Sequence, residues 1–286
     1  MMSSIVQLLF GVFIGILLIL FYGICIERYL VGFPRYRIRV PNLPQSFSGF
    51  TIVHISDLHY GPLVPYWFLK RLLKRVDDLE KDAIVCTGDY VLGRNVPWRV
   101  DRAWSLLCPL SAPHGVHSVL GNCDHWADSE RSLRRMAECG QDLRGKAVEI
   151  RKGEDSLWIA GAGDLMEDHI PLDEFLGAIP EPACRIVLAH NPDTADTPFS
   201  ARVDLMLSGH THGGQVNIPF VGPPVLPVKN KTYSSGLKFS PRGMPVFISR
   251  GIGWAVYPVR FNCLPEIAVL ELIPKRSQER TIGLLV

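Results

Sequence analysis

Seven residues of the types that bind metal ions recur along this chain, and nearly all of them stand where an apolar segment ends. These residues are Asp57, His59, Asp89, Asn122, His190, His210 and His212. The segments involved, residues 50–55, 83–86, 116–120, 186–189 and 203–207, have the length and composition of buried β-strands. Because the carboxyl ends of strands in an open α/β sheet meet in one crevice, we expect the seven side chains to converge there.

The residue types suit a pair of divalent metal ions. Two ions roughly 3.5–4 Å apart need a bridging anion and neutral flanking ligands, so that the net charge stays positive enough to acidify a water molecule. One aspartate must therefore bridge. Neutral imidazoles suit Zn, Mn and Fe, and carboxylates suit Mn and Mg, so all four metals are candidates and manganese suits both ligand types.

Histidines at strand ends are also found buried and hydrogen-bonded without any metal, and a single Asp-x-His pair would favour that interpretation. Five separate matches in the order that a two-metal site needs favour the metal centre instead. A metal-free scaffold that uses the fold as a binding platform is the alternative from another functional class.

From about residue 51 to residue 272 the chain resembles the calcineurin-like metallophosphoesterase superfamily. Five segments look like its bacterial membrane-associated phosphodiesterase branch, which includes enzymes similar to UDP-2,3-diacylglucosamine pyrophosphatase. They are Asp57-Leu-His-Tyr, Gly88-Asp-Tyr-Val, Leu188-Ala-His-Asn-Pro-Asp, Gly209-His-Thr-His-Gly-Gly-Gln and Arg260-Phe-Asn-Cys-Leu-Pro-Glu.

This resemblance implies an α/β fold built as a two-layer β-sandwich flanked by helices. It also implies how the ligands are divided between the metals. Asp57, His59 and His212 would hold the first metal, and Asn122, His190 and His210 the second. Asp89 would bridge the two, and Asn122 would also contact the substrate.

The third motif departs from the superfamily pattern. It usually reads Gly-Asn-His-Asp/Glu, and its histidine protonates the leaving alkoxide, but here Cys123 replaces that histidine in Gly121-Asn-Cys-Asp-His. A thiol with a pKa near ~8.5 is a poor general acid. We expect His125 to be a loop histidine, solvated or bonded to a neighbour. Asp124 is a candidate catalytic residue beside the cysteine.

The missing acid bears on the substrate. An alkoxide, whose conjugate acid has a pKa near ~15.7, needs a proton as it leaves. A phosphate monoester, with a second pKa near ~6, leaves without one. The site therefore favours a phosphoanhydride, and the resemblance suggests UDP-2,3-diacylglucosamine of lipid A biosynthesis, cleaved to UMP and the acylated sugar 1-phosphate. A phosphodiesterase of undefined substrate is the nearest alternative.

Residues 5–26 contain no charge and are long enough to span ~30 Å of hydrocarbon as a helix. A signal peptide carries a positive charge before its apolar core, but no Lys or Arg precedes this segment. We therefore expect a single-pass anchor rather than a cleaved leader. A buried amphiphilic hairpin is the alternative. Arg28, Arg35, Arg37 and Arg39 follow the segment, which predicts an inner-membrane protein with its catalytic domain in the cytoplasm.

The predicted organisation is an anchor over residues 1–30, a linker over 31–48, the metallophosphoesterase domain over 49–274 and a tail over 275–286. Helices are expected at residues 66–79, 98–110 and 129–139. The strands at residues 157–160, 246–249 and 267–272 are expected to form a second sheet. The seven cysteines lack paired spacing, so free thiols are expected.

The net charge of +2 does not indicate nucleic-acid binding. The expected partners are instead the membrane and a phosphorylated, lipid-linked small molecule, while protein partners are unknown. Apolar residues 62–69 and 219–228 are candidates for lipid contact, although packing against the core is at least as good an explanation. Lys70, Arg71, Lys74 and Arg75 are candidates for anionic head groups, and Arg250 for a substrate phosphate, with a solvated face and a structural ion pair as the respective alternatives.

Overall fold

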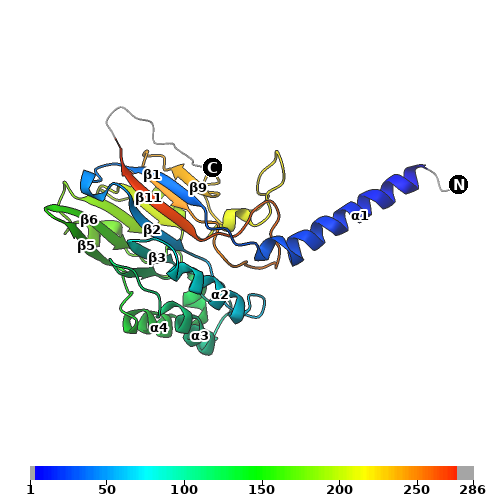
Figure 1. Ribbon diagram of the computed structural model, residues 1–286, viewed down its shortest axis with the longest axis horizontal. Coiled ribbons are helices and arrows are strands. Elements are labelled where there is room, and N and C mark those ends of the chain that lie inside the picture. Colours follow the sequence, from blue (N-terminus) through cyan, green and yellow to red (C-terminus); the bar gives the residue numbers. More distant parts are fainter. Residues whose placement is uncertain (1–3, 276–286) are drawn as a thin grey trace.

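Two β-sheets packed face to face form the centre of the computed structural model, which describes residues 4–275 (Figure 1). The first sheet has, in spatial order, β1 (Arg35–Val40), β11 (Ala268–Pro274), β2 (Phe50–Ile55), β3 (Ala83–Thr87) and β4 (Val116–Val119). The second has β5 (Lys146–Lys152), β6 (Asp155–Gly161), β7 (Cys184–Leu188), β8 (Leu205–Ser208), β10 (Pro245–Ile248) and β9 (Gly236–Phe239). This confirms the expected sandwich.

The strands that precede the predicted ligands are mostly apolar, because both of their faces are largely covered. β3, β7 and β8 are buried at every position. One core cluster lies between the sheets and includes Phe50, Leu188 and Phe247. The β2–β3–β4 and β6–β7–β8–β10 neighbours pair in parallel, so their carboxyl ends point to one edge of the sandwich.

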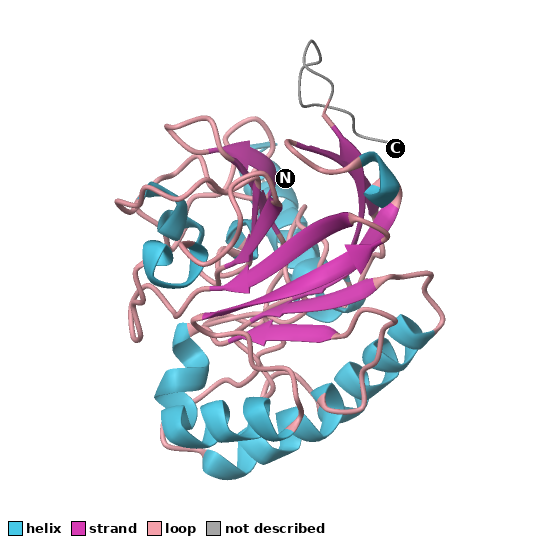
Figure 2. Ribbon diagram, turned by 90° about the vertical axis from the view of Figure 1, so that its left-hand side faces the viewer, coloured by secondary structure: helices cyan, strands magenta, loops and turns pink. Residues whose placement is uncertain are grey.

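Helices cover the outer faces of both sheets (Figure 2). The first sheet is covered by α2 (Tyr66–Asp77), α3 (Pro97–Leu107) and α4 (Asn122–Glu138), and the second by α5 (Leu172–Leu176) and the short 3₁₀ helix η3 (Pro192–Asp196). The spacing of Leu69, Leu72, Leu73 and Val76 gives α2 one apolar face, which is buried in the core against the first sheet.

Helix α1 (Ser4–Cys25) projects away from the sandwich (Figure 1), and its apolar side chains are almost all exposed. It is long and apolar enough to cross a membrane. Short 3₁₀ helices at Glu27–Tyr29, Gln45–Phe47 and His212–Gly214 complete the described elements.

Three expectations about organisation differ from the structure. Residues 31–48, the expected linker, contain β1, which pairs in parallel with β11 and buries Ile38 and Val40. The strand at residues 267–272 belongs to the first sheet as β11, between β1 and β2. The helix expected at residues 129–139 begins at Asn122, because helical turns continue through the third motif and across a kink at Asp128.

The cysteine expectation is also corrected. Cys108 and Cys139 form a disulfide with a Cα–Cα distance of 5.2 Å. They follow α3 and α4, and the packing of these helices brings their ends together. The other five cysteines, all within residues 4–275, are free. Most of the expected C-terminal tail, residues 276–286, lies outside the described residues.

Candidate functional site

The loops after the parallel strands bring the predicted ligands together at one edge of the sandwich. Three overlapping groups of side chains have all their potential ligand atoms within 4.8 Å of one another. The groups are Asp57, His59 and His212; His59, Asp89 and Cys123; and Asp89, His190 and His210. Sequence segments from five strand ends therefore meet in a single cluster, as the order of the motifs predicts.

The first group closes around two imidazole rings. Nε2 of His59 lies 2.9 Å from Nε2 of His212, and the rings stack with their centroids 4.8 Å apart. Oδ1 of Asp57 lies 3.4 Å from Nε2 of His212 and 3.9 Å from Nε2 of His59. Three potential ligand atoms thus converge on one point.

Asp89 lies between this group and the other histidines. Its Oδ2 atom is 3.5 Å from Nε2 of His59 and 3.4 Å from Nε2 of His190. Nε2 of His190 is in turn 3.1 Å from Nδ1 of His210. The backbone N–H of Cys123 donates to the other oxygen, Oδ1 of Asp89, at 2.8 Å, which fixes the carboxylate between the two histidine pairs.

The amide of Asn122 completes the cluster. Its side chain is buried and lines the cavity above the ligands, yet Oδ1 accepts no hydrogen bond from any residue that the structure describes. A buried acceptor without a partner costs about 1–3 kcal/mol. A divalent cation would give this amide oxygen the partner that it lacks. The donor set therefore fits the expected metal pair.

The backbone at this edge is held in an uncommon conformation. Asp57, His59, Asp89, His210 and His212 all have positive φ, between 47° and 70°. Non-glycine residues adopt this region rarely, and such strain is retained where surrounding contacts impose it. It turns each side chain back toward the shared edge immediately after its strand.

Glycines in the motifs allow the loops to approach one another. A Cβ atom on Gly209 would collide with Ser56 Oγ and with the Asp57 carboxylate, and one on Gly121 would collide with the Asp89 carboxylate. The backbone N–H of His210 consequently reaches Asp57, with Oδ1 and Oδ2 both at 3.1 Å. Only glycine fits at these two positions.

Burial keeps most of the imidazoles neutral and able to offer a lone pair. It lowers the pKa of His59 to about 4 and that of His212 well below 6.5, and it also lowers the pKa of His210. His190 differs, because the charge of Asp89 and its hydrogen bond outweigh the effect of burial and raise the pKa of His190 to about 10. The negative charge of Asp89 therefore stabilises a positive charge beside it.

Backbone carbonyls orient two of the rings. Nδ1 of His190 donates to the carbonyl of Thr87 at 2.6 Å, which leaves Nε2 free to face Asp89. Nε2 of His210 donates to the carbonyl of Pro227 at 2.9 Å, which leaves Nδ1 facing His190. Hydrogen bonds of this kind set the tautomer and direction of metal-binding histidines.

Asp124, expected to be catalytic, instead ties the loops together. Its fully buried carboxylate accepts four backbone N–H groups: Oδ2 from Asp89 at 2.8 Å and Gly121 at 3.0 Å, and Oδ1 from Tyr90 at 2.8 Å and Val91 at 3.2 Å. The carboxylate of Asp124 thus links the loop of Asp89 to the turn at Gly121.

Cys123 faces the cavity, as its place in the third motif predicts. Burial raises the pKa of its thiol, and the nearby Asp89 carboxylate raises it further, so the group is a neutral thiol. His125 belongs to the first turn of α4, where Nδ1 lies 2.8 Å from the hydroxyl of Ser129. His125 is therefore a helix residue and not the loop histidine that was expected, although the expected bond to a neighbour is present.

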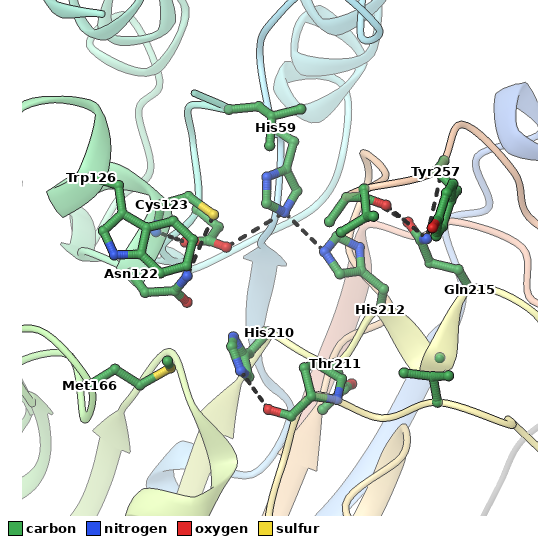
Figure 3. A pocket seen from close by; sticks show the side chains of 17 residues that line it. His59, Asn122, Cys123, Trp126, Met166, His210, Thr211, His212, Gln215 and Tyr257 are labelled. Atoms are coloured by element: carbon green, nitrogen blue, oxygen red, sulfur yellow. Dashed lines mark hydrogen bonds and ion pairs between the residues drawn. The ribbon is translucent and has the colours of Figure 1, made fainter. Parts of the chain in front are cut away.

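The cluster lies at the bottom of a cavity of about 430 Å³ with mainly apolar walls. His59 points into it from the loop after β2, and His210 and His212 from the loop after β8, with Trp126 and Met166 on one side and Tyr257 on the other (Figure 3). The remaining apolar wall residues are Leu92, Val225, Pro227, Ala255 and Val256. Val225 and Pro227 belong to residues 219–228, which were expected from the sequence as a candidate apolar surface, whereas the rest of the wall was not identified.

Arg250, expected to contact a substrate phosphate, is paired within the protein. Nε donates to Oε2 of the buried Glu266 at 2.9 Å, and Nη2 donates to the same carboxylate. Arg250 lines a second cavity of about 430 Å³ together with Tyr22 and Glu27. The structural ion pair raised as the alternative is therefore present.

Arg260 is a second feature that sequence reasoning missed, although it opens one of the five quoted segments. It is fully buried, and its guanidinium donates to the carbonyls of His212 at 3.3 Å and Arg250 at 2.8 Å. Cys263 Sγ also lies 3.3 Å from the carbonyl of His212. These contacts support the loop that carries His212.

Comparisons with known proteins agree with this geometry. The family model for the calcineurin-like phosphoesterase matches residues 50–214. The chain is 32% identical to the phosphodiesterase YaeI of Escherichia coli over 84% of its own length and 88% of that protein. It is 27% identical to the UDP-2,3-diacylglucosamine pyrophosphatase LpxG of Chlamydia trachomatis, with 81% and 87% covered.

An uncharacterized metallophosphoesterase of Bacillus subtilis, YkuE, is 30% identical, with 88% of each chain covered. Among solved structures, a dimetal phosphatase from Danio rerio aligns with a TM-score of 0.43 and 14% identity, covering 72% of this chain and 88% of that one. The match to the family model spans more than half of the chain and includes every residue of the three ligand groups. Together with the clustered ligands, it shows that this chain belongs to the calcineurin-like phosphoesterase family and is a metal-dependent phosphoester hydrolase.

Proposed function

We propose that Asp89 bridges two divalent metal ions. Asp57, His59 and His212 hold the first, and Asn122, His190 and His210 hold the second. The observation that carries the assignment is the place of Asp89 Oδ2, 3.5 Å from Nε2 of His59 on one side and 3.4 Å from Nε2 of His190 on the other. The unpartnered Oδ1 of Asn122 supports the second set.

Such a pair of ions supplies Lewis-acid polarisation of a phosphoryl oxygen and lowers the pKa of a bound water. The chain's own residues do the positioning. The backbone carbonyl of Thr87 orients the ring of His190, and that of Pro227 orients the ring of His210. Asp124 fixes the loop of Asp89, and Arg260 fixes the loop of His212. The amide of Asn122 is also placed to contact the phosphoryl group, since it lines the cavity.

The residue at the leaving-group position favours an anhydride as substrate. Cys123 stands where the family's acid histidine is found, and its thiol stays neutral because burial raises its pKa. Such a group protonates an alkoxide poorly. A phosphate leaving group, with a second pKa near ~6, leaves without that proton.

The favoured substrate is UDP-2,3-diacylglucosamine, cleaved to UMP and 2,3-diacylglucosamine 1-phosphate. The apolar wall formed by Leu92, Trp126, Met166, Val225 and Val256 offers surface to acyl chains beside the proposed metals. The similarity to LpxG supports the same choice. The similarity to YaeI supports the second candidate, a phosphodiesterase of undefined substrate.

We also propose that α1 anchors the protein in the inner membrane and that the domain faces the cytoplasm. The exposed apolar surface of α1 supports the anchor. Arg28, Arg35 and Arg37, which follow α1, support the orientation. On this proposal residues 31–274 form the catalytic domain, since β1 belongs to the first sheet.

The test is a direct comparison of substrates by the purified full-length protein with added manganese. We expect hydrolysis of UDP-2,3-diacylglucosamine to UMP, with a higher kcat/KM than for bis(p-nitrophenyl) phosphate. A higher kcat/KM for the aryl diester would favour the phosphodiesterase. If the protein binds two metals but hydrolyses neither substrate, both candidate functions would be contradicted.

A further inference from the structure

Several loops around the cavity expose large apolar side chains to solvent. Val221, Val256 and Tyr257 are 77%, 74% and 69% exposed, and Phe220 is fully exposed. Val256 and Tyr257 also line the cavity, as does the exposed Val225. We define these five residues, together with Ile218, as the apolar rim. An exposed cluster of this kind marks an interaction surface rather than an ordinary solvated loop.

The two loops of the rim are joined to each other. The backbone N–H of Asn217 donates to the carbonyl of Phe261 at 2.8 Å, and that of Phe261 donates to the carbonyl of Gln215 at 2.9 Å. The Gln215 amide also bonds to Ala255 in both directions, at 2.7 and 3.0 Å. The loop that carries Phe220 therefore has a fixed place beside the loop that carries Tyr257.

The same loop is joined to the end of the membrane helix. The backbone N–H of Arg260 donates to the carbonyl of Gly23 at 3.1 Å, and a Cβ on Gly23 would lie only 2.7 Å from the Arg260 carbonyl. The buried carboxylate of Glu27 accepts the N–H groups of Asn262 at 3.0 Å and Cys263 at 2.6 Å. Helix α1 thus ends directly on the loop that forms one side of the cavity.

Aromatic and basic groups stand at this junction. The Arg28 guanidinium lies 4.7 Å from the ring centre of Tyr29 and 4.6 Å from that of Trp254, and it donates to the carbonyl of Pro258 at 3.1 Å. Trp67, 64% exposed at the start of α2, lies beside Phe68, which contacts Tyr29. Trp254 is buried in the core, but an exposed Trp67 and a partly exposed Arg28 and Tyr29 at the end of an apolar helix are typical of the boundary between lipid and water.

We propose that the apolar rim enters the head-group and acyl boundary of the bilayer that α1 spans, so that the active-site cavity opens toward the lipid. The occupant is a lipid bilayer rather than a protein, because the rim continues the exposed apolar surface of α1 through the loop at residues 254–264. The substrate then reaches the cavity from the membrane, acyl chains first along the rim. This inference rests on the proposed anchor and names the source of the substrate.

The first experiment places a fluorophore on the rim of the full-length protein. In a Cys25→Ser background, which removes the exposed thiol, Phe220→Cys is labelled with an environment-sensitive dye and reconstituted into phosphatidylcholine and phosphatidylglycerol vesicles. The matched control is Glu154→Cys, at the exposed β5–β6 turn on the far side of the domain from α1 (Figure 1). The Cys25→Ser parent gives the background from the remaining thiols.

We expect the dye at position 220 to shift its emission to the blue and to be quenched by nitroxide-labelled lipids, and the dye at position 154 to do neither. Equal emission and quenching at the two positions would overturn the proposal and would leave a protein partner as the explanation of the exposed rim.

The second experiment separates membrane access from chemistry. Phe220→Ser with Val221→Ser should slow hydrolysis of an amphiphilic phosphodiester embedded in vesicles about tenfold or more, while hydrolysis of bis(p-nitrophenyl) phosphate in solution stays within about twofold. Phe239→Ser, on the exposed edge strand β9, is the matched control. Equal losses on both substrates would overturn the proposal. If the unmutated protein does not hydrolyse bis(p-nitrophenyl) phosphate at all, that result would instead count against the hydrolase function itself.

Discussion

Nε2 of His59 lies 2.9 Å from Nε2 of His212, although the two residues are 153 positions apart in the sequence. Burial keeps both rings neutral by lowering their pKa values. Two neutral rings approach this closely only when a proton or a cation lies between their lone pairs. The approach of Asp57 Oδ1 to 3.4 Å from His212 favours a cation.

His212→Ala should therefore empty the first metal position preferentially, and His190→Ala the second. Each variant should retain about one metal per chain and lose about a hundredfold or more of activity, since the two ions act together. Elemental analysis after gel filtration measures the metal content. His169→Ala, an exposed histidine, is the control and should keep both metals. Loss of the same metal in both variants would contradict the division of ligands.

Cys123 tests the argument about the leaving group. Cys123→Ala should leave hydrolysis of UDP-2,3-diacylglucosamine within about tenfold of the parent, because loss of a true general acid costs ~10²–10⁴. Cys123→His should raise activity on alkyl phosphodiesters more than on the diphosphate, since only the alkoxide needs the proton. Rates on both substrates and the metal content would be measured. A collapse of diphosphate turnover in the alanine variant, with metals bound, would show that the thiol takes part.

His54 predicts a pH dependence of stability. Its ring is fully buried, bonded through Nε2 to the hydroxyl of Thr87 at 2.8 Å, and burial lowers its pKa from 6.5 to about 3. Below pH 6.5 the unfolded chain binds a proton that the folded protein does not, so the penalty is absent above pH 6.5 and grows as the pH falls toward 3. It reaches about 2 kcal/mol at pH 5.

His54→Gln removes this group, so the difference in unfolding free energy between parent and variant should change by about 2 kcal/mol between pH 7.5 and pH 5. Urea unfolding of the parent and the variant measures this difference. A chelator is present in both samples so that metal release does not contribute. A difference that is constant across that range would mean that His54 accepts a proton in the folded state.

The orientation of the domain has a test of its own. The arginines after α1 favour a domain in the cytoplasm, whereas the disulfide between Cys108 and Cys139 is typical of an oxidising compartment. We expect a reporter fused after Val286 to be active in the cytoplasm. A reporter active only when exported, with the disulfide intact, would reverse the orientation.

The sequence predicts the position of the site better than it predicts the outer strand β1, for a physical reason. Most of the ligands follow a strand that is buried on both faces, so the apolar run and the polar residue after it can both be recognised in the sequence. β1 was missed because three arginines alternate with Tyr36, Ile38 and Val40, and only its pairing with β11 shows which face is buried. The alternation itself was a signal for a strand.

Contacts between distant segments could not be predicted. The bond between Cys108 and Cys139 depends on how α3 packs against α4. The position of Asp124 beneath Asp89, rather than beside the reacting group, depends on the turn at Gly121. The pairing of Arg250 with Glu266 likewise joins two loops that carry no common pattern.

Asp89 gives the most direct test of the two-metal site. Its Oδ2 atom is the one carboxylate oxygen that the structure, over residues 4–275, places near both histidine pairs, through His59 and His190. Metal content and hydrolysis would be measured together for the parent, for Asp89→Asn and for the exposed control Asp155→Asn. We predict about two metals per chain and full activity in the parent and the control, and fewer than two metals with activity lost by at least ~10³ in Asp89→Asn. Near-normal hydrolysis by Asp89→Asn with both metals bound would contradict the dinuclear mechanism.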